Sequence, residues 1–306
     1  MTRPIRDIAA SVRQRLGNLA KAQNRPHQEL LQYFAIERFL HRLAISRHRD
    51  RFVLKGALML TVWRAPTTRP TMDIDLLGSG RNRTEELEAV VRELCGVTID
   101  PADGLAFEPE SVVGEEITIE AEYVGVRITF RATLGTARIP MQVDVGFGDA
   151  VVDADPDVEL PTLLDFPAPR LRGYSRETAI AEKLNAMFQH GRLNSRMKDY
   201  FDVLLLASHF AFDGGKLADA IRATFERRET PLQARPVGLT GEFAEQPDKQ
   251  VQWAAFLRKI RATDAPAKLE DAVDRIGAFL LPVLAGLVES GTFGGGWEPG
   301  GPWVRR

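Results

Sequence analysis

The 306-residue sequence contains a single cysteine, Cys95. One cysteine cannot form an internal disulfide, which excludes the small disulfide-stabilised secreted classes and fits a reducing cytosol. The sequence also lacks any run of about 18 consecutive apolar residues, the length that would predict a transmembrane helix. Its first ten residues hold no long apolar stretch, so no signal peptide is predicted. We therefore expect a cytoplasmic protein with no membrane partner.

Three common arrangements of functional residues are missing as well. The five histidines are scattered and show no metal-ligand spacing, so the sequence does not predict a zinc site. The phosphate-binding pattern Gly-x-x-x-x-Gly-Lys-Ser/Thr is absent, which excludes a P-loop NTPase. The pattern Gly-x-Ser-x-Gly is absent too, which argues against an α/β hydrolase.

Charge is distributed unevenly along the chain. Residues 1–51 hold eleven Lys/Arg and four Asp/Glu, a balance of +7, whereas residues 73–159 hold six Arg and twenty Asp/Glu, a balance of −14. Such asymmetry is typical of a polyanion-binding arm beside a metal-binding acidic surface. Two oppositely charged solvated faces that attract each other would show the same pattern.

The periodicity of apolar residues predicts helices first, then strands, then helices again. Predicted helices cover 8–21, 27–44, 84–95, 175–188, 194–209, 250–262 and 268–289, and predicted strands cover 52–54, 71–77, 117–123, 126–134 and 141–147. Gly125 is the expected hairpin turn, and a proline-rich stretch at 156–172 is the best boundary. This order predicts an α+β fold: a mixed-sheet core over 1–165, a helical lobe over 166–290 and an irregular tail over 291–306.

Two aspartates two residues apart are the first candidate for chemistry. On a strand, Asp73 and Asp75 point to the same face, and two neighbouring carboxylates repel each other unless a cation lies between them. Mg²⁺ is such a cation, because it binds one or two carboxylates together with water and substrate phosphates. Asp144 is the polar residue of another alternating strand. If the two strands are neighbours, three carboxylates meet, as in two-metal phosphoryl transfer.

A Lys-Gly pair at the end of the first predicted strand is the second candidate. Glycine lets the backbone approach a phosphate closely, so Lys55, Gly56 and Ala57 form a candidate nucleotide-binding segment.

The predicted helical lobe offers a third group. Asp199 and Asp202 are three residues apart on one helix and share a face beside apolar residues. Such carboxylates need a partner, and Lys183 is the obvious one. The pair either joins two helices or places Lys183 against a triphosphate with Asp199 or Asp202 orienting it or acting as a base. Arg196 and Lys198 flank the same segment.

Five segments together resemble the nucleotidyltransferase-like toxins of the AbiEii/AbiGii family. They are Phe52–Leu58, Arg69–Leu76, Val143–Asp149, Ala181–Leu184 and Lys198–Asp202, and they follow the family's order. The resemblance implies a DNA-polymerase-β-like nucleotidyltransferase core, Mg²⁺ (or Mn²⁺), an NTP substrate and a toxin role beside a cognate antitoxin. By this resemblance, Asp73 and Asp75 would bind the metal ion and Lys183 would contact a phosphate. Asp199 or Asp202 would complete the site, and Asp144 would correspond to the third carboxylate of the fold.

The resemblance is incomplete at Gly56-Ala57-Leu58, where the family often has Gly-Gly-Thr or Gly-Ser. The hydroxyl that would help hold a phosphate is absent here, so Gly56 and backbone amides would have to suffice.

Three functions follow as hypotheses. The resemblance favours transfer of a nucleoside monophosphate to an RNA, with the 3′ acceptor end of tRNA as the expected acceptor and a block of translation as the result. Arginine-rich surfaces at 38–51 and 170–196 would then track the RNA backbone. The alternatives are the same transfer to a protein hydroxyl, and an NTP-binding interaction protein without turnover.

Overall fold

A computed structural model of the chain describes residues 7–66, 70–80, 83–119 and 123–304. The chain divides into two compact units. The first unit comprises Met1–Arg64, Pro70–Gly148 and Asp155–Gly173, and the second comprises Ala65–Arg69, Asp149–Ala154 and Tyr174–Arg306. The segments Ala65–Arg69 and Asp149–Ala154 thus belong to the second unit, although residues of the first unit flank each of them in sequence.

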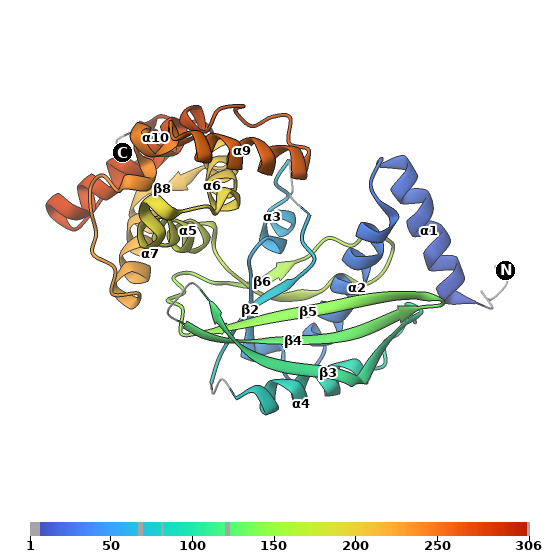
Figure 1. The fold of residues 1–306 in the computed structure, drawn as a ribbon. Coiled ribbons are helices and arrows are strands. Elements are labelled where there is room, and N and C mark those ends of the chain that lie inside the picture. Colours follow the sequence, from blue (N-terminus) through green and yellow to red (C-terminus); the bar gives the residue numbers. More distant parts are fainter. Residues whose placement is uncertain (1–6, 67–69, 81–82, 120–122, 305–306) are drawn as a thin grey trace. The chain divides into compact units, whose positions relative to one another are not determined.

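A seven-stranded mixed sheet forms the centre of the first unit (Figure 1). Its strands are β1 (Phe52–Lys55), β2 (Ile74–Gly78), β3 (Leu105–Ile119), β4 (Tyr123–Leu134), β5 (Ala137–Phe147), β6 (Asp155–Glu159) and β7 (Arg170–Gly173). Their order is β3-β4-β5-β2-β1-β7-β6. The pairs β2–β5 and β1–β7 are parallel, and the other neighbours are antiparallel. The predicted neighbourhood of the Asp73–Asp75 and Asp144 segments is therefore present.

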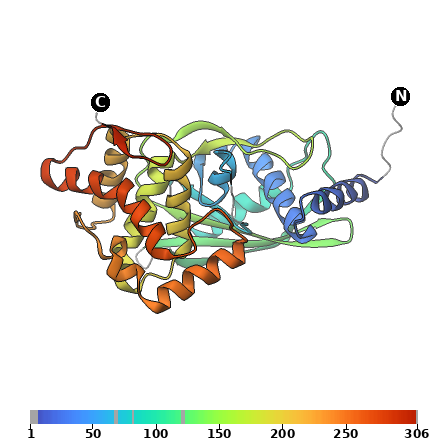
Figure 2. The same ribbon diagram turned by 90° about the horizontal axis from the view of Figure 1, so that it is seen from above.

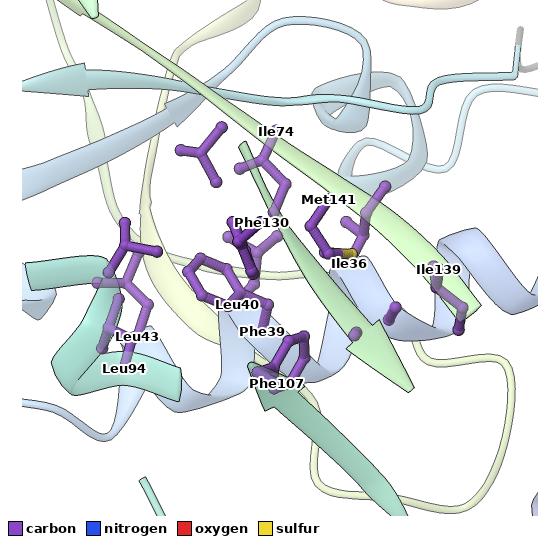
Figure 3. Packing of buried hydrophobic residues seen from close by; sticks show 14 of the residues in the cluster. Ile36, Phe39, Leu40, Leu43, Ile74, Leu94, Phe107, Phe130, Ile139 and Met141 are labelled. Carbon is purple, nitrogen blue, oxygen red and sulfur yellow. The ribbon is translucent and has the colours of Figure 1, made fainter. Parts of the chain in front are cut away.

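Helices cover the apolar face of this sheet. They are α1 (Ile8–Ala22), α2 (His27–Ala44), α3 (Leu58–Val62) and α4 (Thr84–Cys95), with a short 3₁₀ turn at Arg49–Arg51. In the core, Phe39 of α2 packs against Phe107 of β3 and Phe130 of β4, at ring-centroid distances of 5.6 and 4.9 Å (Figure 3). The core residues of β2 and β5, Ile74 and Val143, are at most 1% exposed. Burial of this face leaves the opposite face of β2 and β5 for polar side chains.

The predicted hairpin turn at Gly125 is wrong. Gly125 lies inside β4 and pairs with Ile117 of β3, and both strands are longer than predicted. A glycine within a strand gives the same local signal as a turn glycine, so pairing over a long hairpin overrides the turn preference here.

The second unit is mainly helical and forms the yellow to red ribbons of Figures 1 and 2. Its helices are α5 (Arg176–His190), α6 (Met197–His209), α7 (Gly214–Arg227), α8 (Gly241–Ala244), α9 (Pro247–Ile260) and α10 (Leu269–Ser290), with 3₁₀ turns at Gly191–Leu193 and Val237–Leu239. Ser175 caps α5 by accepting a hydrogen bond from the Thr178 amide, and Asp213 caps α7 by accepting one from the Lys216 amide. These side-chain oxygens satisfy amides that have no partner within the helix.

Residues 296–297 and 303–304 form strands, although the sequence predicts an irregular tail over 291–306. The strands β8 (Phe212–Asp213), β9 (Gly296–Trp297) and β10 (Trp303–Val304) form a small antiparallel sheet in the order β10-β9-β8. The indole of Trp297 is buried and donates a hydrogen bond of 2.7 Å to the Ala207 carbonyl. Burial of Trp297 in this small sheet supplies packing that a Gly-rich sequence does not predict.

The predicted boundary also differs from the structure. Two strands of the first unit, β6 and β7, lie in the proline-rich region, and β7 pairs in parallel with β1. The compact first unit therefore extends to Gly173 rather than ending at 165.

The predicted fold class, α+β with a mixed sheet and a helical C-terminal part, is confirmed. Among the described residues, no helix is long and apolar enough to span a membrane.

Candidate active site

Four charged residues lie side by side across four neighbouring strands of the sheet. Backbone pairing aligns Arg127 of β4 with Asp144 of β5, Asp144 with Asp75 of β2, and Asp75 with Lys55 of β1. Paired residues project to the same face, so these four form one row, which we call the charged row. The residues on either side of Asp75, Ile74 and Leu76, point to the core. A one-residue shift in register would bury the charges, which fixes the pairing.

The carboxylate of Asp75 lies directly against the backbone of Gly56. A Cβ atom at Gly56 would be 2.0 Å from Oδ2 of Asp75 and 2.7 Å from its Cγ, and Gly56 has φ of +73°. Both the left-handed backbone and the lack of a side chain are therefore required at this position. The sequence predicts that a phosphate approaches the Gly56 backbone, and in the structure the group that lies against Gly56 is the Asp75 carboxylate.

Asp73 precedes β2, which begins at Ile74 rather than at the predicted Thr71. Hydrogen bonding to Asp144 raises the pKa of the Arg127 guanidinium, and the negative charge of Asp73 adds to this rise. Asp73 therefore lies within electrostatic reach of the charged row, although it is outside the paired strand.

Asp144 is held by a residue that the sequence analysis did not single out. The Nε and Nη2 atoms of Arg127 donate to its two oxygens at 2.9 and 2.8 Å. Nε2 of Gln142 lies 3.2 Å from each of the same oxygens. The available signal for Arg127 was its place as a charged residue between Val126 and Ile128 in an alternating strand. Its partner could be found only from the strand pairing.

The predicted nucleotide-binding segment is only partly built as expected. Lys55 ends β1 in the charged row, and Gly56 follows it at the turn. Ala57 is buried, and the helix after it, α3, has five residues. One helical turn carries too little aligned dipole to bind a phosphate by itself, so its N-terminus supports no anion site.

The second unit brings together the predicted helical group. Nζ of Lys183 on α5 lies 3.1 Å from Oδ1 of Asp199 and 2.7 Å from Oδ2 of Asp202 on α6. The two carboxylates are 1–2% exposed and the Lys183 side chain is 17% exposed, so the ammonium is the group of this trio nearest to solvent. The predicted ion pair between the two helices is therefore present.

Arg196 joins this group, with Nε 2.5 Å from Oδ2 of Asp199. Burial alone would raise the pKa of Asp199, but the charges of Lys183 and Arg196 outweigh it and lower the pKa to about 2. Lys198, on the exposed side of the first turn of α6, adds to this lowering. Asp199 is thus a stable anion at neutral pH, which suits an orienting carboxylate better than a general base.

The sheet site has the right chemistry for a hard divalent cation. Asp73 and Asp75 offer carboxylate oxygens, the ligands that hard cations prefer. The missing side chain at Gly56 makes room for the Asp75 carboxylate. Among the described residues, no group of three or more His, Cys, Asp or Glu side chains is preorganised to hold a metal ion. Two carboxylates suit Mg²⁺, which completes its shell with water and substrate phosphates.

A protein-family model described as nucleotidyl transferase AbiEii toxin, type IV toxin–antitoxin system, matches residues 38–275. The chain belongs to the AbiEii toxin family. The match spans the charged row, the Gly56 turn and the helical group, and a family of this type implies an NTP substrate and an antitoxin partner. The family predicted from the five sequence segments is confirmed, as is the transferase class.

Two crystal structures from Helicobacter pylori are similar to this AbiEii-family chain. One, a nucleotidyltransferase candidate, is 16% identical, with a TM-score of 0.47 and coverage of 86% of this chain and 98% of that chain. The other, JHP933, is 15% identical, with the same TM-score and coverage of 86% and 95%. A comparison with curated proteins found no match. The family assignment accordingly rests on the family model.

Proposed function

We propose that this AbiEii-family chain transfers a nucleoside monophosphate from an NTP to a hydroxyl of an RNA, with the 3′ end of tRNA as the expected acceptor. The observation that carries the proposal is the contact between the Asp75 carboxylate and Gly56 at the end of the Lys55 strand. This contact supports the proposal because it brings the Asp75 carboxylate next to the Gly56 backbone and beside Lys55, within the part of the chain that the family model matches.

In this proposal Asp73 and Asp75 hold Mg²⁺ or Mn²⁺, which when bound would offset phosphate charge and lower the pKa of an attacking hydroxyl. Lys55 and the Gly56 backbone contact the triphosphate. The RNA hydroxyl oxygen bonds to the α-phosphorus as the bond to the β-phosphate oxygen breaks, so pyrophosphate leaves and the hydroxyl proton is released.

Lys183 is the proposed phosphate contact of the helical unit. Asp199 and Asp202 fix its ammonium from the buried side, so the side chain loses little further freedom when it binds a phosphate. Arg196 and Lys198 add positive charge beside it.

The basic surface for RNA is smaller than the sequence predicts. Arg38 is fully buried and donates to the Pro167 carbonyl, and Arg42 is buried in an ion pair with Asp103. Neither guanidinium can reach an RNA backbone. Arg47 and Arg192 are 75% and 64% exposed and remain candidates for phosphate contact.

The test is transfer of label from each α-³²P-labelled NTP to total tRNA in the presence of Mg²⁺, with Asp75→Asn as the inactive control. We expect label on RNA with at least one NTP and none with the variant. Label that resists RNase and is removed by protease would instead indicate a protein acceptor. If no NTP labels either macromolecule, the proposed transfer is wrong and NTP binding without turnover becomes the better description.

A further inference from the structure

The carboxylate of Asp144 has already used its capacity to accept hydrogen bonds. Each oxygen accepts one N–H from Arg127, at 2.9 and 2.8 Å, and lies 3.2 Å from the amide nitrogen of Gln142. A carboxylate offers about four lone-pair positions, and these contacts occupy them. A metal ion could bind Asp144 only by displacing a two-bond guanidinium contact, the strongest geometry for such a pair.

The charges of the row lead to the same conclusion. Asp73, Asp75, Asp144 and Glu115, the β3 partner of Arg127, carry four negative charges, and Lys55 and Arg127 carry two positive charges within or beside the same row. One divalent cation at Asp73 and Asp75 therefore brings the group from a net −2 to 0, which removes the net repulsion of a polyanion. A second divalent cation at Asp144 would lie beside the Arg127 guanidinium and be repelled by it.

We propose that Arg127 is a nucleotide-binding residue in the place of a second metal ion, and that Asp144 is its positioning residue rather than a metal ligand. The inference rests on the proposed function, since it assigns a role within the same nucleotide site. Guanidinium groups bind phosphate oxygens with two parallel hydrogen bonds, and this one is fixed in advance by Asp144.

The geometry leaves part of Arg127 available for that contact. Its side chain is 35% exposed, whereas that of Asp144 is 15% exposed. Among the residues that the structure describes, no acceptor bonds to its Nη1 atom. Arg127 can thus keep both bonds to Asp144 and still donate to a phosphate.

The first measurement is Mn²⁺ binding to the full chain without nucleotide, followed by electron paramagnetic resonance. We expect Asp73→Asn and Asp75→Asn to raise the Kd for Mn²⁺ by at least about tenfold, as for loss of a ligand. Asp144→Asn should leave the Kd within about threefold of the wild-type value. A loss of Mn²⁺ affinity in Asp144→Asn equal to that in Asp75→Asn would overturn the proposal.

The second measurement is calorimetric binding of a non-hydrolysable NTP analogue with Mn²⁺. Arg127→Gln should raise the Kd of the analogue about tenfold or more, and Arg127→Lys, which keeps the charge without the fork, should have a smaller effect. The matched control is Arg131→Gln, four residues along the same strand, where the arginine forms a surface pair with Glu108 at 2.7 Å. Equal Kd values for Arg127→Gln and Arg131→Gln would contradict the inference.

A double-variant cycle of Asp144→Asn and Arg127→Gln tests whether Asp144 acts by positioning Arg127 or only by stabilising the fold. If Asp144 acts through Arg127, Asp144→Asn weakens analogue binding in the wild type but adds almost nothing in the Arg127→Gln background. If the effects of the two substitutions on analogue binding are fully additive, Asp144 does not act through Arg127. The proposed function fails separately, when Asp73→Asn and Asp75→Asn leave both Mn²⁺ and analogue binding unchanged.

Discussion

At Gly56 the absence of a side chain sets the position of a carboxylate on the neighbouring strand. The contact joins the end of β1 to β2, and it involves Asp75, which the sequence predicts to be a metal ligand.

Gly56→Ala should lower the rate of nucleotide transfer about 100-fold while leaving the protein folded. The added methyl would displace the Asp75 carboxylate by more than 1 Å, and errors of that size cost about 100-fold in rate. Transfer activity and Mn²⁺ affinity are the measurements. The control is Gly80→Ala, because Gly80 also has positive φ, at +99°, but a Cβ there meets nothing within 4 Å. Both variants lose about 1–3 kcal/mol through backbone strain, so equal activities would contradict the steric argument.

Glu37 makes stability depend on pH. Its side chain is fully buried on α2, and burial raises its pKa to about 8, although the Leu163 amide donates to it at 2.9 Å. Between its unfolded value near 4.5 and about 8, the folded state binds more protons than the unfolded state. Stability is therefore full below pH 4.5 and is lost as pH rises through 8.

Glu37→Gln, which mimics the protonated form, should remove this pH dependence. We compare the free energies of unfolding of the variant and the wild type at each pH. The gain of the variant over the wild type should be about 1–3 kcal/mol larger at pH 8 than at pH 5. Urea unfolding at the two pH values measures it. The same difference at both pH values would show that Glu37 is not a buried acid of raised pKa.

At the scale of elements, α5 and α6 are joined by an ion pair that is both structural and, in our proposal, functional. Lys183→Met would remove the ammonium that contacts both Asp199 and Asp202, and both carboxylates are buried. Loss of one partner of a buried pair costs about 3–5 kcal/mol. Both stability and transfer activity should therefore fall.

The double variant Lys183→Met with Asp202→Asn separates the two roles. Removal of the Asp202 charge, which no longer has the Lys183 ammonium beside it, should recover much of the stability, while Asp199 keeps Arg196 as its partner at 2.5 Å. Activity should stay lost if Lys183 contacts phosphate. If activity recovers together with stability, Lys183 has only a structural role and does not contact phosphate.

The small C-terminal sheet supports α6 through Trp297. Trp297→Ala should destabilise the helical unit by about 3–5 kcal/mol, because it empties a buried aromatic site. Trp297→Phe keeps most of the packing but loses the bond to the Ala207 carbonyl near the end of α6, and should cost less. Hydrogen exchange of the last turn of α6, with urea unfolding, measures both. An Ala variant as stable as the wild type would show that the tail does not support α6.

For the whole molecule, family membership predicts that the chain is toxic to a bacterial cell that lacks its antitoxin. Induced expression should arrest growth, and Asp75→Asn expressed to the same level should not. Growth rate and the amount of soluble protein are measured together, so that poor folding is not mistaken for lost toxicity. Equal arrest by both forms would separate toxicity from nucleotidyl transfer.

Local patterns predicted much of this protein because their causes are local. Apolar spacing predicted α2, α4, α6 and α10. Motif order predicted the family. The roles of the site residues, by contrast, stay predictions until the experiments above are done.

Tertiary structure decided what depends on pairing between distant segments. Gly125 lies in a strand because β3 and β4 pair along their length, and β9 belongs to a small sheet that the burial of Trp297 supports. Arg127 lies 17 positions from Asp144 in sequence, and only strand register makes them partners. By itself the sequence determined most of the helices and the Asp73–Asp75 pair, since each is encoded within a few residues, and the order of five short segments determined the family. Which charges surround that pair is set by long-range register, which no local pattern specifies.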